Sequence, residues 1–248
     1  MDEQVNRLVT KVSARLQRTP PERRLLIGIA GIPGSGKTTL SKIIVSSLNT
    51  LAAQDPSSSA PPPPTGGDVA VCVPMDGFHL TRAQLSAMPD PQTAHARRGA
   101  EFTFDGAAFL GLVTSLREQE PLSDAKEIQT MYAPSFDHAV KDPKPNDIEI
   151  RREHRVVVFE GNYLALDKSP WKEAAALMDE LWFVDVPFPL ARTRLAARHV
   201  ASGIVPDLDA GFRRADDNDL VNGEEIVRLR LPVHEVITSR EDGKWVHT

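Results

Sequence analysis

Residues 25–39 read LLIGIAGIPGSGKTT, and this stretch decides the fold of the chain. Residues 25–30 form a continuous apolar run, which predicts a buried strand of a parallel sheet, and residues 38–51 follow as a helix. Between them, residues 31–38 match the pattern G-x-x-x-x-G-K-[ST] in the strand-to-helix setting that the pattern requires. The stretch therefore predicts a phosphate-binding loop within an α/β fold.

The residue types of this loop suit a bound triphosphate. Glycines at positions 31, 34 and 36 allow backbone conformations that bring N–H groups together on phosphate oxygens at a helix N-terminus. Lys37 adds a positive charge near the β- and γ-phosphates, and the Thr38 hydroxyl is a suitable oxygen ligand for Mg²⁺. The predicted nucleotide-binding residues of the loop are Gly31, Pro33, Gly34, Ser35, Gly36, Lys37, Thr38 and Thr39.

Strand and helix patterns alternate along the rest of the chain. Apolar runs predict three more strands, at residues 69–73, 156–159 and 181–185. Helices are expected at residues 171–178 and from Asp105, a good N-cap, to about Leu116. This alternation is typical of a mainly parallel central sheet with helices on both faces. We therefore predict one domain, 1–248, with the three-layer sandwich of the P-loop NTPases.

Additional segments are expected around this core. An amphipathic helix within residues 1–20 precedes it, and residues 53–68 are rich in Pro and Ser. That composition predicts a mobile surface insertion or, alternatively, a polyproline ligand for a partner domain.

Two hairpins are also expected. The apolar residues 128–131 and 148–150 flank a polar, Pro-containing stretch, which predicts a small protruding hairpin on the substrate side. Near the end, residues 236–238 and 244–246 flank Asp242-Gly243, which predicts a closing hairpin.

Composition and charge argue against several classes of protein. The chain has 248 residues and a net charge of -5, which gives no reason to expect binding to nucleic acid or to an anionic membrane. No apolar run approaches the ~20 residues of a membrane span, and the acidic start is unlike a targeting segment. Cys72 is the single cysteine. We expect a cytoplasmic protein, monomeric or homodimeric.

Two carboxylates follow predicted strands. Asp76 comes directly after the second strand, within Met75-Asp76-Gly77-Phe78-His79, where it can accept the proton of an acceptor hydroxyl or, alternatively, mark only a strand-exit turn. Glu160 ends the strand at residues 156–159, the arrangement that completes the metal site of a P-loop protein. Asp185 is the competing metal ligand, although it is also placed to cap the next helix.

A cluster of basic residues follows at residues 187–204, which we interpret as a lid. Arg192, Arg194, Arg198 and His199 lie on one predicted helix, with Arg194 and Arg198 four residues apart on the same face. Such a face can close over ATP and stabilise the charge of a transferred phosphoryl group. The alternative is a solvated basic helix face.

With these motifs together, the chain resembles the phosphoribulokinase/uridine kinase-like family of P-loop kinases, from about Leu25 to Leu231. The resemblance is carried by the following residues: Gly31 to Thr39, Met75 to His79, Arg97-Arg98-Gly99 with Thr103-Phe104-Asp105, Pro134 to His138, Glu160-Gly161-Asn162-Tyr163, Arg194 to His199, and Asn218-Asp219.

The resemblance implies roles for individual residues. It implies that Asp76 is the catalytic base, that the helix of Arg192 to His199 is the lid, and that the stretch around Asn218 lies near the adenine. Together with the motifs above, the predicted catalytic residues are Asp76, Lys37, Arg194 and Arg198, and the predicted metal ligands are Thr38, Glu160 and Asp76. The implied acceptor-binding residues are Asp76, His79, Arg98, Asp137, His138, Glu160 and Asn162.

The sequence thus predicts an enzyme that uses ATP and Mg²⁺ to phosphorylate a hydroxyl of a small metabolite, such as a nucleoside, pantothenate, glycerate or a sugar. Arg97 and Arg98 favour an acceptor with a carboxylate or phosphate, unless they pair with Glu101 or Asp105 instead. The competing hypothesis is an ATP-binding regulator of the same fold with weak catalysis.

Overall fold

The structure is a computed structural model that describes residues 2–54, 67–119 and 129–240. Most of the predicted insertion at residues 53–68 lies outside these ranges, and so does the second arm of the predicted closing hairpin, residues 244–246. Within the described part of the chain, no helix is long and apolar enough to cross a membrane.

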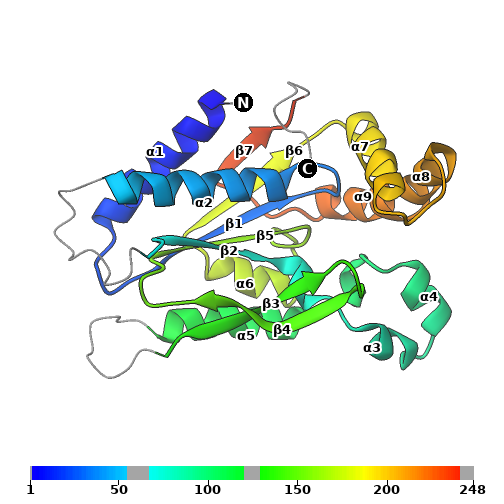
Figure 1. Ribbon diagram of the computed structural model, residues 1–248, viewed down its shortest axis with the longest axis horizontal. Helices are drawn as coiled ribbons and strands as arrows, with labels where there is room; N and C mark the ends of the chain where they lie inside the picture. The colour runs from blue at the N-terminus through cyan, green and yellow to red at the C-terminus, as the bar shows by residue number, and fades with distance from the viewer. Residues whose placement is uncertain (1, 55–66, 120–128, 241–248) are drawn as a thin grey trace.

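The central sheet has five parallel strands in the order β2-β5-β1-β6-β7. Figure 1 shows the strands running side by side through the middle of the molecule. Their bounds are β1 (Leu25–Gly31), β2 (Ala70–Pro74), β5 (Val156–Gly161), β6 (Glu180–Asp185) and β7 (Glu235–Thr238). The mainly parallel α/β sheet predicted from the sequence is therefore confirmed.

The edge strand β7 has a partner that the sequence did not predict. Residues 236–238 were expected to form one arm of a closing hairpin, yet β7 pairs in parallel with β6 and extends the central sheet. Ile237 of β7 is fully buried, whereas Val236 beside it is half exposed. Burial of one alternate face against the core is enough to hold an edge strand in register.

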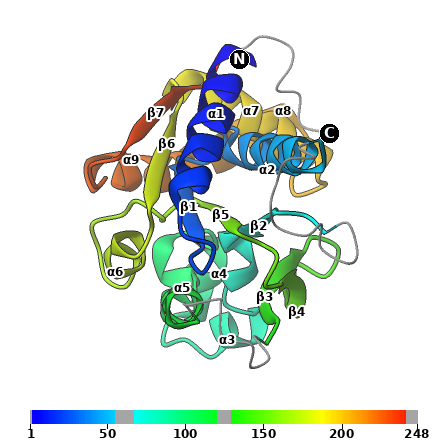
Figure 2. The ribbon, with the colours of Figure 1, turned by 90° about the vertical axis from the view of Figure 1, so that its left-hand side faces the viewer.

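Apolar side chains cover both faces of the sheet, because each strand points successive residues in opposite directions. Leu25, Ile27 and Ile29 of β1 pack with α1 (Asp2–Arg18) and α2 (Lys37–Gln54) on one face. Leu26 and Ala30 pack on the other face with helices α5 (Gly106–Glu118) and α6 (Trp171–Ala176). Figure 2 shows these helices on opposite sides of the strands. The three-layer sandwich is thus confirmed.

Two groups of elements flank the carboxyl ends of the strands, above and below in Figure 1. The upper group consists of α7 (Phe188–Ala201), α8 (Leu208–Arg214), the π-helical η3 (Ala215–Asp219) and α9 (Leu220–Arg228). The lower group contains η1 (Met75–Phe78), α3 (Arg82–Ser86), α4 (Pro91–Ala96), η2 (Glu101–Thr103), and the antiparallel pair β3 (Met131–Asp137) and β4 (Asp142–Ile150). The pair β3–β4 is the predicted protruding hairpin.

The N-cap predicted for α5 is confirmed, whereas the N-cap considered for α7 is wrong. Asp105 caps α5, because its Oδ1 accepts a hydrogen bond of 2.8 Å from the Ala108 N–H. Asp185 was a candidate cap for α7, but the N-cap residue is Pro187 and no side chain caps this end. Proline at the first positions of α7 fixes the backbone angle there and removes one N–H that would need a partner.

A cluster of ion pairs holds α1 against the edge of the sheet. Lys11 donates hydrogen bonds to Glu180 of β6 at 2.9 Å and to Glu235 of β7 at 2.8 Å. Arg15 also binds Glu180, and Arg7 binds Glu235 at 2.7 Å. Glu180 is only 3% exposed. A buried carboxylate needs such partners, so the cluster fixes the position of α1.

Replacing the buried member of this cluster tests its contribution. Burial opposes ionisation of Glu180, but hydrogen bonds from Trp182 and Lys11 outweigh it and hold the pKa of Glu180 below its ordinary value of 4.5. Glu180→Gln should therefore lower the free energy of unfolding at pH 7 by roughly 1–3 kcal/mol. The difference should shrink as the pH falls through the lowered pKa, where the carboxylate of the wild type is protonated.

The measurement is urea unfolding of both proteins at several pH values between neutral and acid. Glu173→Gln, which changes an exposed glutamate of α6, is the matched control and should unfold like the wild type. A destabilisation by Glu180→Gln that stays constant down to acid pH would contradict the role of the charge.

Candidate nucleotide and phosphoryl-transfer site

The phosphate-binding loop joins β1 to α2 and packs against α7. Gly34 and Gly36 have φ angles of 77° and 91°, in the left-handed region that favours glycine. A Cβ atom on Gly34 would lie 2.9 Å from the carbonyl oxygen of Ala191 in α7, so the close approach of the helix also requires glycine. The hydroxyl of Ser35 is fully buried and has no hydrogen-bond partner among the described residues. These features suit a loop built to receive phosphate oxygens.

Lys37 stands among charges from four different segments. Its ammonium group donates a long hydrogen bond of 3.5 Å to the carbonyl oxygen of Ile32 within the loop. Burial lowers the pKa of Lys37, whereas the charges of Glu160, Asp76 and Asp219 raise it and that of Arg198 lowers it further. The fold therefore brings the loop lysine together with both predicted carboxylates and one lid arginine.

Glu160 is the carboxylate beside the loop. It ends β5, the strand next to β1, and the Thr38 hydroxyl lies 3.2 Å from each of its carboxylate oxygens. Asp185, the competing metal ligand, lies exposed at the end of β6, where its carbonyl oxygen accepts the Ser239 N–H. The structure thus places Glu160, and not Asp185, against the predicted metal-binding hydroxyl.

The burial of Glu160 makes the site suitable for a divalent cation. Glu160 is 4% exposed, and burial raises its pKa to about 7, an effect that Lys37 opposes and the charge of Asp76 reinforces. A dication would offset the cost of ionising a buried carboxylate beside a second one. Thr38, Glu160 and Asp76 are all oxygen donors, which fits the hard Mg²⁺ ion predicted from the sequence.

Asp76 lies in η1, directly after the strand that flanks β5. Pro74 of β2 pairs with Glu160, so Asp76 emerges near Glu160 at the same edge of the sheet. The backbone of η1 is pressed against the hairpin, since a Cβ on Gly77 would lie 2.1 Å from the carbonyl oxygen of Pro134. Asp76 therefore lies where the hairpin and the carboxyl ends of the strands meet.

His79 forms part of an aromatic wall beside Asp76. Its Nδ1 atom lies 2.8 Å from the carbonyl oxygen of Asp76, and its ring centroid lies 4.0 Å from that of Phe104 and 4.9 Å from that of Phe136. Burial lowers the pKa of His79, although the charge of Asp76 raises it. The ring is accordingly neutral at physiological pH and presents an apolar surface with one polar edge.

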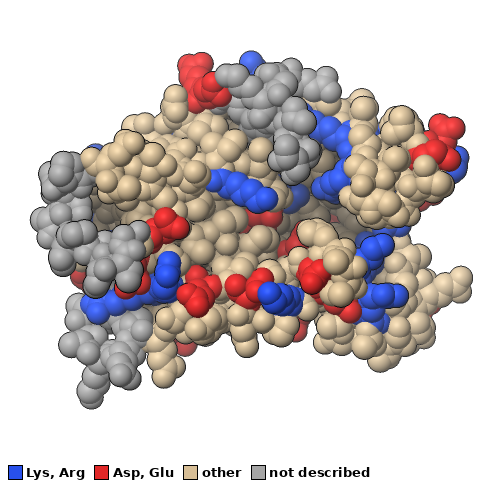
Figure 3. Space-filling view, in the orientation of Figure 1, with Lys and Arg blue, Asp and Glu red and all other residues tan. Residues whose placement is uncertain are grey.

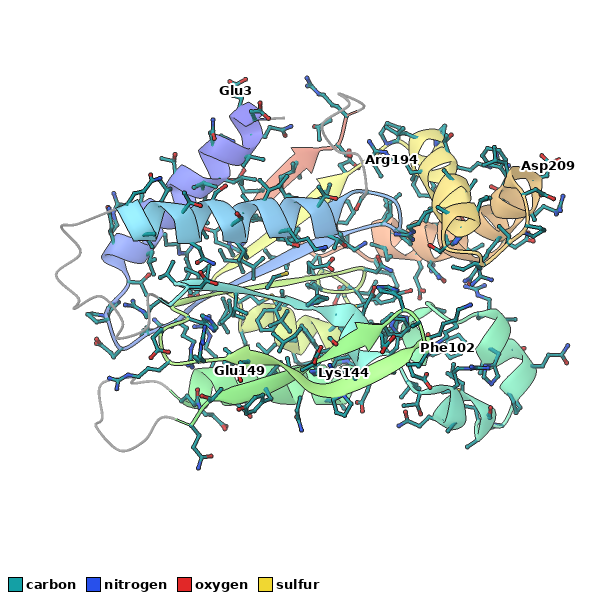
Figure 4. The ribbon with its side chains drawn as sticks, viewed as in Figure 1. Glu3, Phe102, Lys144, Glu149, Arg194 and Asp209 are labelled. Carbon is teal, nitrogen blue, oxygen red and sulfur yellow. The ribbon has the colours of Figure 1, made fainter. Side chains whose placement is uncertain are left out.

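The predicted lid arginines occupy different positions. Arg194 donates hydrogen bonds to Ser239 Oγ at 2.8 Å and to the carbonyl oxygen of Gly34 at 3.3 Å, so it fastens α7 to the phosphate loop. Figure 4 shows it at the side of α7 that faces the end of β7. Arg192 pairs with Asp216 on the surface. Arg198 is exposed on α7, and its charge acts on Lys37.

Of the other residues predicted to bind the acceptor, Asp137 already accepts hydrogen bonds from the protein, whereas His138 and Asn162 have polar atoms available. Asp137 caps the hairpin turn, because its Oδ1 accepts hydrogen bonds of 2.8 Å from Ala139 N–H and 3.2 Å from Val140 N–H. His138 is exposed and lies in an edge-to-face contact with Phe136, with the ring centroids 5.2 Å apart. Asn162 keeps a buried Oδ1 without a hydrogen-bond partner in the described ranges.

The two arginines of the Arg97-Arg98 pair do not bind the acidic residues suggested by the sequence. Glu101 instead binds Lys168 and the Trp171 indole, and Asp105 caps α5. Arg97 donates a hydrogen bond of 2.7 Å to Asn222 Oδ1, and Arg98 forms an ion pair of 2.9 Å with Asp142. The sequence did not identify these two partners. Asn222 is 125 residues from Arg97 in the sequence and Asp142 is 44 residues from Arg98, so no local pattern marks them.

Figure 3 shows this end of the molecule hollowed between the two flanking groups, with Lys and Arg side chains along both sides of the hollow. The phosphate loop, Glu160 and Asp76 all come from the strand ends between those groups. A polyanionic ligand would be attracted to such a hollow.

Comparisons with known proteins agree with this geometry. A family model, the Phosphoribulokinase / Uridine kinase family, matches residues 26–201. The ATP-dependent kinase-like protein notR' of Aspergillus versicolor is 55% identical over 171 residues, which cover 69% of this chain and 95% of that protein. The crystal structure of YFH7 from Saccharomyces cerevisiae shares 25% identity with a TM-score of 0.78, covering 96% of this chain and 99% of that one.

A second solved structure is also similar. It is a protein from Silicibacter sp. TM1040, provisionally described as a fructose transport system kinase, with 33% identity and a TM-score of 0.74. The match covers 94% of this chain and 98% of that chain.

The raised pKa of Glu160 leads to a prediction on stability. Because the folded pKa of about 7 exceeds the ordinary value of 4.5, the protonated acid stabilises the fold below pH 4.5 and this contribution is lost as the pH rises through 7. Glu160→Gln resembles the protonated acid. At pH 8 and without nucleotide, it should be more stable than the wild type by roughly 1–3 kcal/mol, with the difference vanishing towards pH 5.

Thermal melting at pH 5 and pH 8 measures this effect, with Glu149→Gln on the exposed surface of β4 as the matched control (Figure 4). The same melts with ATP, with and without Mg²⁺, test the metal site: the extra stabilisation that Mg²⁺ gives should be lost in Glu160→Gln. Equal stability of the wild type and Glu160→Gln at pH 8 would refute the inference that an ionised, buried Glu160 destabilises the fold.

Proposed function

Because the chain belongs to the phosphoribulokinase/uridine kinase family of P-loop kinases, we propose that it transfers the γ-phosphoryl group of ATP to a hydroxyl of a small metabolite. The observation that carries the proposal is the arrangement of Thr38 against Glu160, with Asp76 emerging beside them from the neighbouring strand. A phosphate loop and a metal-site carboxylate serve any P-loop protein. A second carboxylate beside them, as Asp76 supplies, is suited to accept the proton of an attacking hydroxyl.

The roles proposed for the donor side follow from position. The loop from Gly31 to Thr39 receives the phosphates, and the Lys37 ammonium neutralises charge on the β- and γ-phosphates. Thr38 and Glu160 would hold Mg²⁺, which would supply positive charge that offsets the negative charge of the phosphates. Arg198, exposed on the lid helix and electrostatically coupled to Lys37, is the arginine best placed to approach the transferred group.

The roles proposed for the acceptor side centre on Asp76. Its carboxylate accepts the proton of the attacking hydroxyl or orients that hydroxyl towards the γ-phosphorus. The neutral His79 ring, with Phe104 and Phe136, would contact the apolar face of the acceptor. The proposed acceptors are nucleoside-, pantothenate-, glycerate- or sugar-like compounds. The fructose named for the Silicibacter relative supports including sugars among them.

The acceptor can be found by an assay that assumes no identity for it. Purified protein is incubated with Mg²⁺, ATP labelled at its terminal phosphate and an extract of small metabolites, and the labelled product is identified. Asp76→Asn should bind ATP almost as tightly as the wild type but transfer phosphate at least ~100-fold more slowly, since it lacks the proton acceptor.

Asp209→Asn is the matched control, because Asp209 is exposed on α8 far from the strand ends (Figure 4). Turnover by Asp76→Asn equal to that of the wild type would refute the assignment of Asp76 as the catalytic base. Absence of any labelled product, with intact ATP binding, would favour an ATP-binding regulator instead.

The two lid arginines should respond differently to substitution. Arg198→Ala removes an exposed side chain and should leave the melting temperature unchanged, while kcat falls by roughly 100- to 1,000-fold through lost stabilisation of the transferred charge. Arg194→Ala breaks the contacts to Gly34 and Ser239, so it should lower the melting temperature and weaken ATP binding. Full activity of Arg198→Ala in the labelled-ATP assay would remove it from the proposed mechanism.

A further inference from the structure

The segment Arg97–Gly99 is held by side chains from distant parts of the chain. Asn218 Nδ2 donates a hydrogen bond of 3.2 Å to the carbonyl oxygen of Arg98, and the Tyr163 hydroxyl donates one of 2.8 Å to the carbonyl oxygen of Gly99. Arg97 reaches Asn222 Oδ1 at 2.7 Å. Gly99 itself has a φ of 105°, a conformation that favours glycine. The segment therefore has a fixed conformation tied to both β5 and the η3–α9 region.

The Arg98 guanidinium points the other way, to the tip of the hairpin. It donates hydrogen bonds to the Lys141 carbonyl oxygen at 2.6 Å, to Asp142 Oδ1 at 2.9 Å and to the Leu80 carbonyl oxygen at 3.1 Å. It also lies 5.6 Å from the centroid of the Phe136 ring. Leu80 follows His79, so a single side chain fixes the hairpin tip, the aromatic wall and the exit of η1 relative to one another. A planar guanidinium with several fixed donors is suited to this task.

Asn218 connects this segment to the nucleotide side. It is 5% exposed and lies in η3, a π-helical segment of a kind that is frequent at functional sites. Its neighbour Asp219 pairs at 2.7 Å with His199 of the lid helix α7 and acts on the charge of Lys37. Next along the chain, a Cβ on Gly223 of α9 would lie 3.4 Å from Ile32 of the phosphate loop. The region that holds Arg98 is thus attached to both the lid and the loop.

We propose that Arg98 is a positioning residue that sets the acceptor-side hairpin relative to the nucleotide side, with Asn218 as the connection between them. Both of its terminal nitrogens donate to protein oxygens, and its Nε is buried without a hydrogen-bond partner in the described ranges. We therefore assign the guanidinium to holding the aromatic wall and the hairpin. Nucleotide binding at the loop and lid then tightens the hairpin through Asp219, Asn218 and Arg98. By linkage, an acceptor on the hairpin side strengthens nucleotide binding to the same degree.

This inference rests on the proposed function, because it needs a nucleotide at the phosphate loop. Hydrogen exchange of the full chain, with and without Mg²⁺ and a non-hydrolysable ATP analogue, tests it. In the wild type the analogue should slow exchange at the loop, residues 31–38, and also by about fivefold at the hairpin tip, residues 137–142. With the analogue at a concentration that saturates each variant, the loop should still be protected in Asn218→Ala and in Arg98→Lys, while the protection of the hairpin tip is lost.

Two further variants keep this test decisive. Asp142→Asn weakens the same connection at its far end without shortening any side chain, and it should also abolish the protection of the tip. Lys144→Ala is the control, because it removes an exposed ion pair to Asp147 on the same hairpin, outside the contacts of Arg98 (Figure 4). It should behave like the wild type.

A kinetic readout separates positioning from a merely structural role. In the labelled-ATP assay, serial dilution of the metabolite extract serves as a titration of the acceptor. At saturating ATP, Arg98→Lys should require about fivefold more extract for its half-maximal rate. By the same linkage the KM for ATP at saturating acceptor should rise by about the same factor, with the maximal rate little changed. A merely structural defect would instead lower the maximal rate with the folded fraction.

The outcomes distinguish this inference from the proposed function. Protection of the loop without any protection of the hairpin in the wild type would overturn the coupling and leave the kinase proposal standing. Protection of the hairpin that survives in Asn218→Ala and Asp142→Asn would overturn the assigned connection. Protection at neither place would overturn nucleotide binding and, with it, both proposals.

Discussion

Two carboxylates and an ammonium group gathered at the ends of neighbouring parallel strands form the constraint on which the rest of the structure depends. Glu160 is nearly fully buried, and its pKa of about 7 records the cost of that burial. The arrangement holds only while β1, β5 and β2 stay adjacent and in register, since Lys37, Glu160 and Asp76 follow these three strands. The dense apolar packing on both faces of the sheet supplies that rigidity, so the core has a direct role in the geometry of the site.

The two flanking groups of elements meet this centre in different ways. The lid side is tied to the phosphate loop itself, through Arg194 to the Gly34 carbonyl oxygen and through the tight contact of Gly34 with Ala191. The proposed acceptor side lies around Asp76 and is held against the centre by contacts of the hairpin with η1 and by Arg98. Each half of the cleft therefore takes its position from a different reactant site, and the connection between the halves runs through a few polar side chains.

The sequence predicts those parts of the fold whose determinants are local. An apolar run followed by a glycine loop defines β1 and its turn, and Asp105 caps α5 because its partner N–H lies three residues away. What could not be read locally depends on distant partners. The parallel pairing of β7 with β6, the attachment of Arg194 to Ser239 and that of Arg98 to Asp142 are set by tertiary packing, which sequence spacing does not record. Residue type indicated that these arginines matter, but only the fold separates one that binds protein oxygens from Arg198, which is exposed.

The balance of charge at the strand ends also bears on how ATP would enter. Burial lowers the pKa of Lys37, whereas the charges of Asp76, Glu160 and Asp219 raise it and the charge of Arg198 lowers it. A bare triphosphate would meet these carboxylates at the strand ends, and ionised Glu160 would oppose it most strongly because it is the most deeply buried of them. A triphosphate that carries a divalent cation removes both penalties at once, since the cation satisfies the carboxylate while the loop N–H groups and Lys37 satisfy the phosphate. The site therefore suits the metal–nucleotide complex as a unit, because a cation would meet the buried carboxylate of Glu160, whose pKa burial raises to about 7, while the phosphates meet the loop and Lys37.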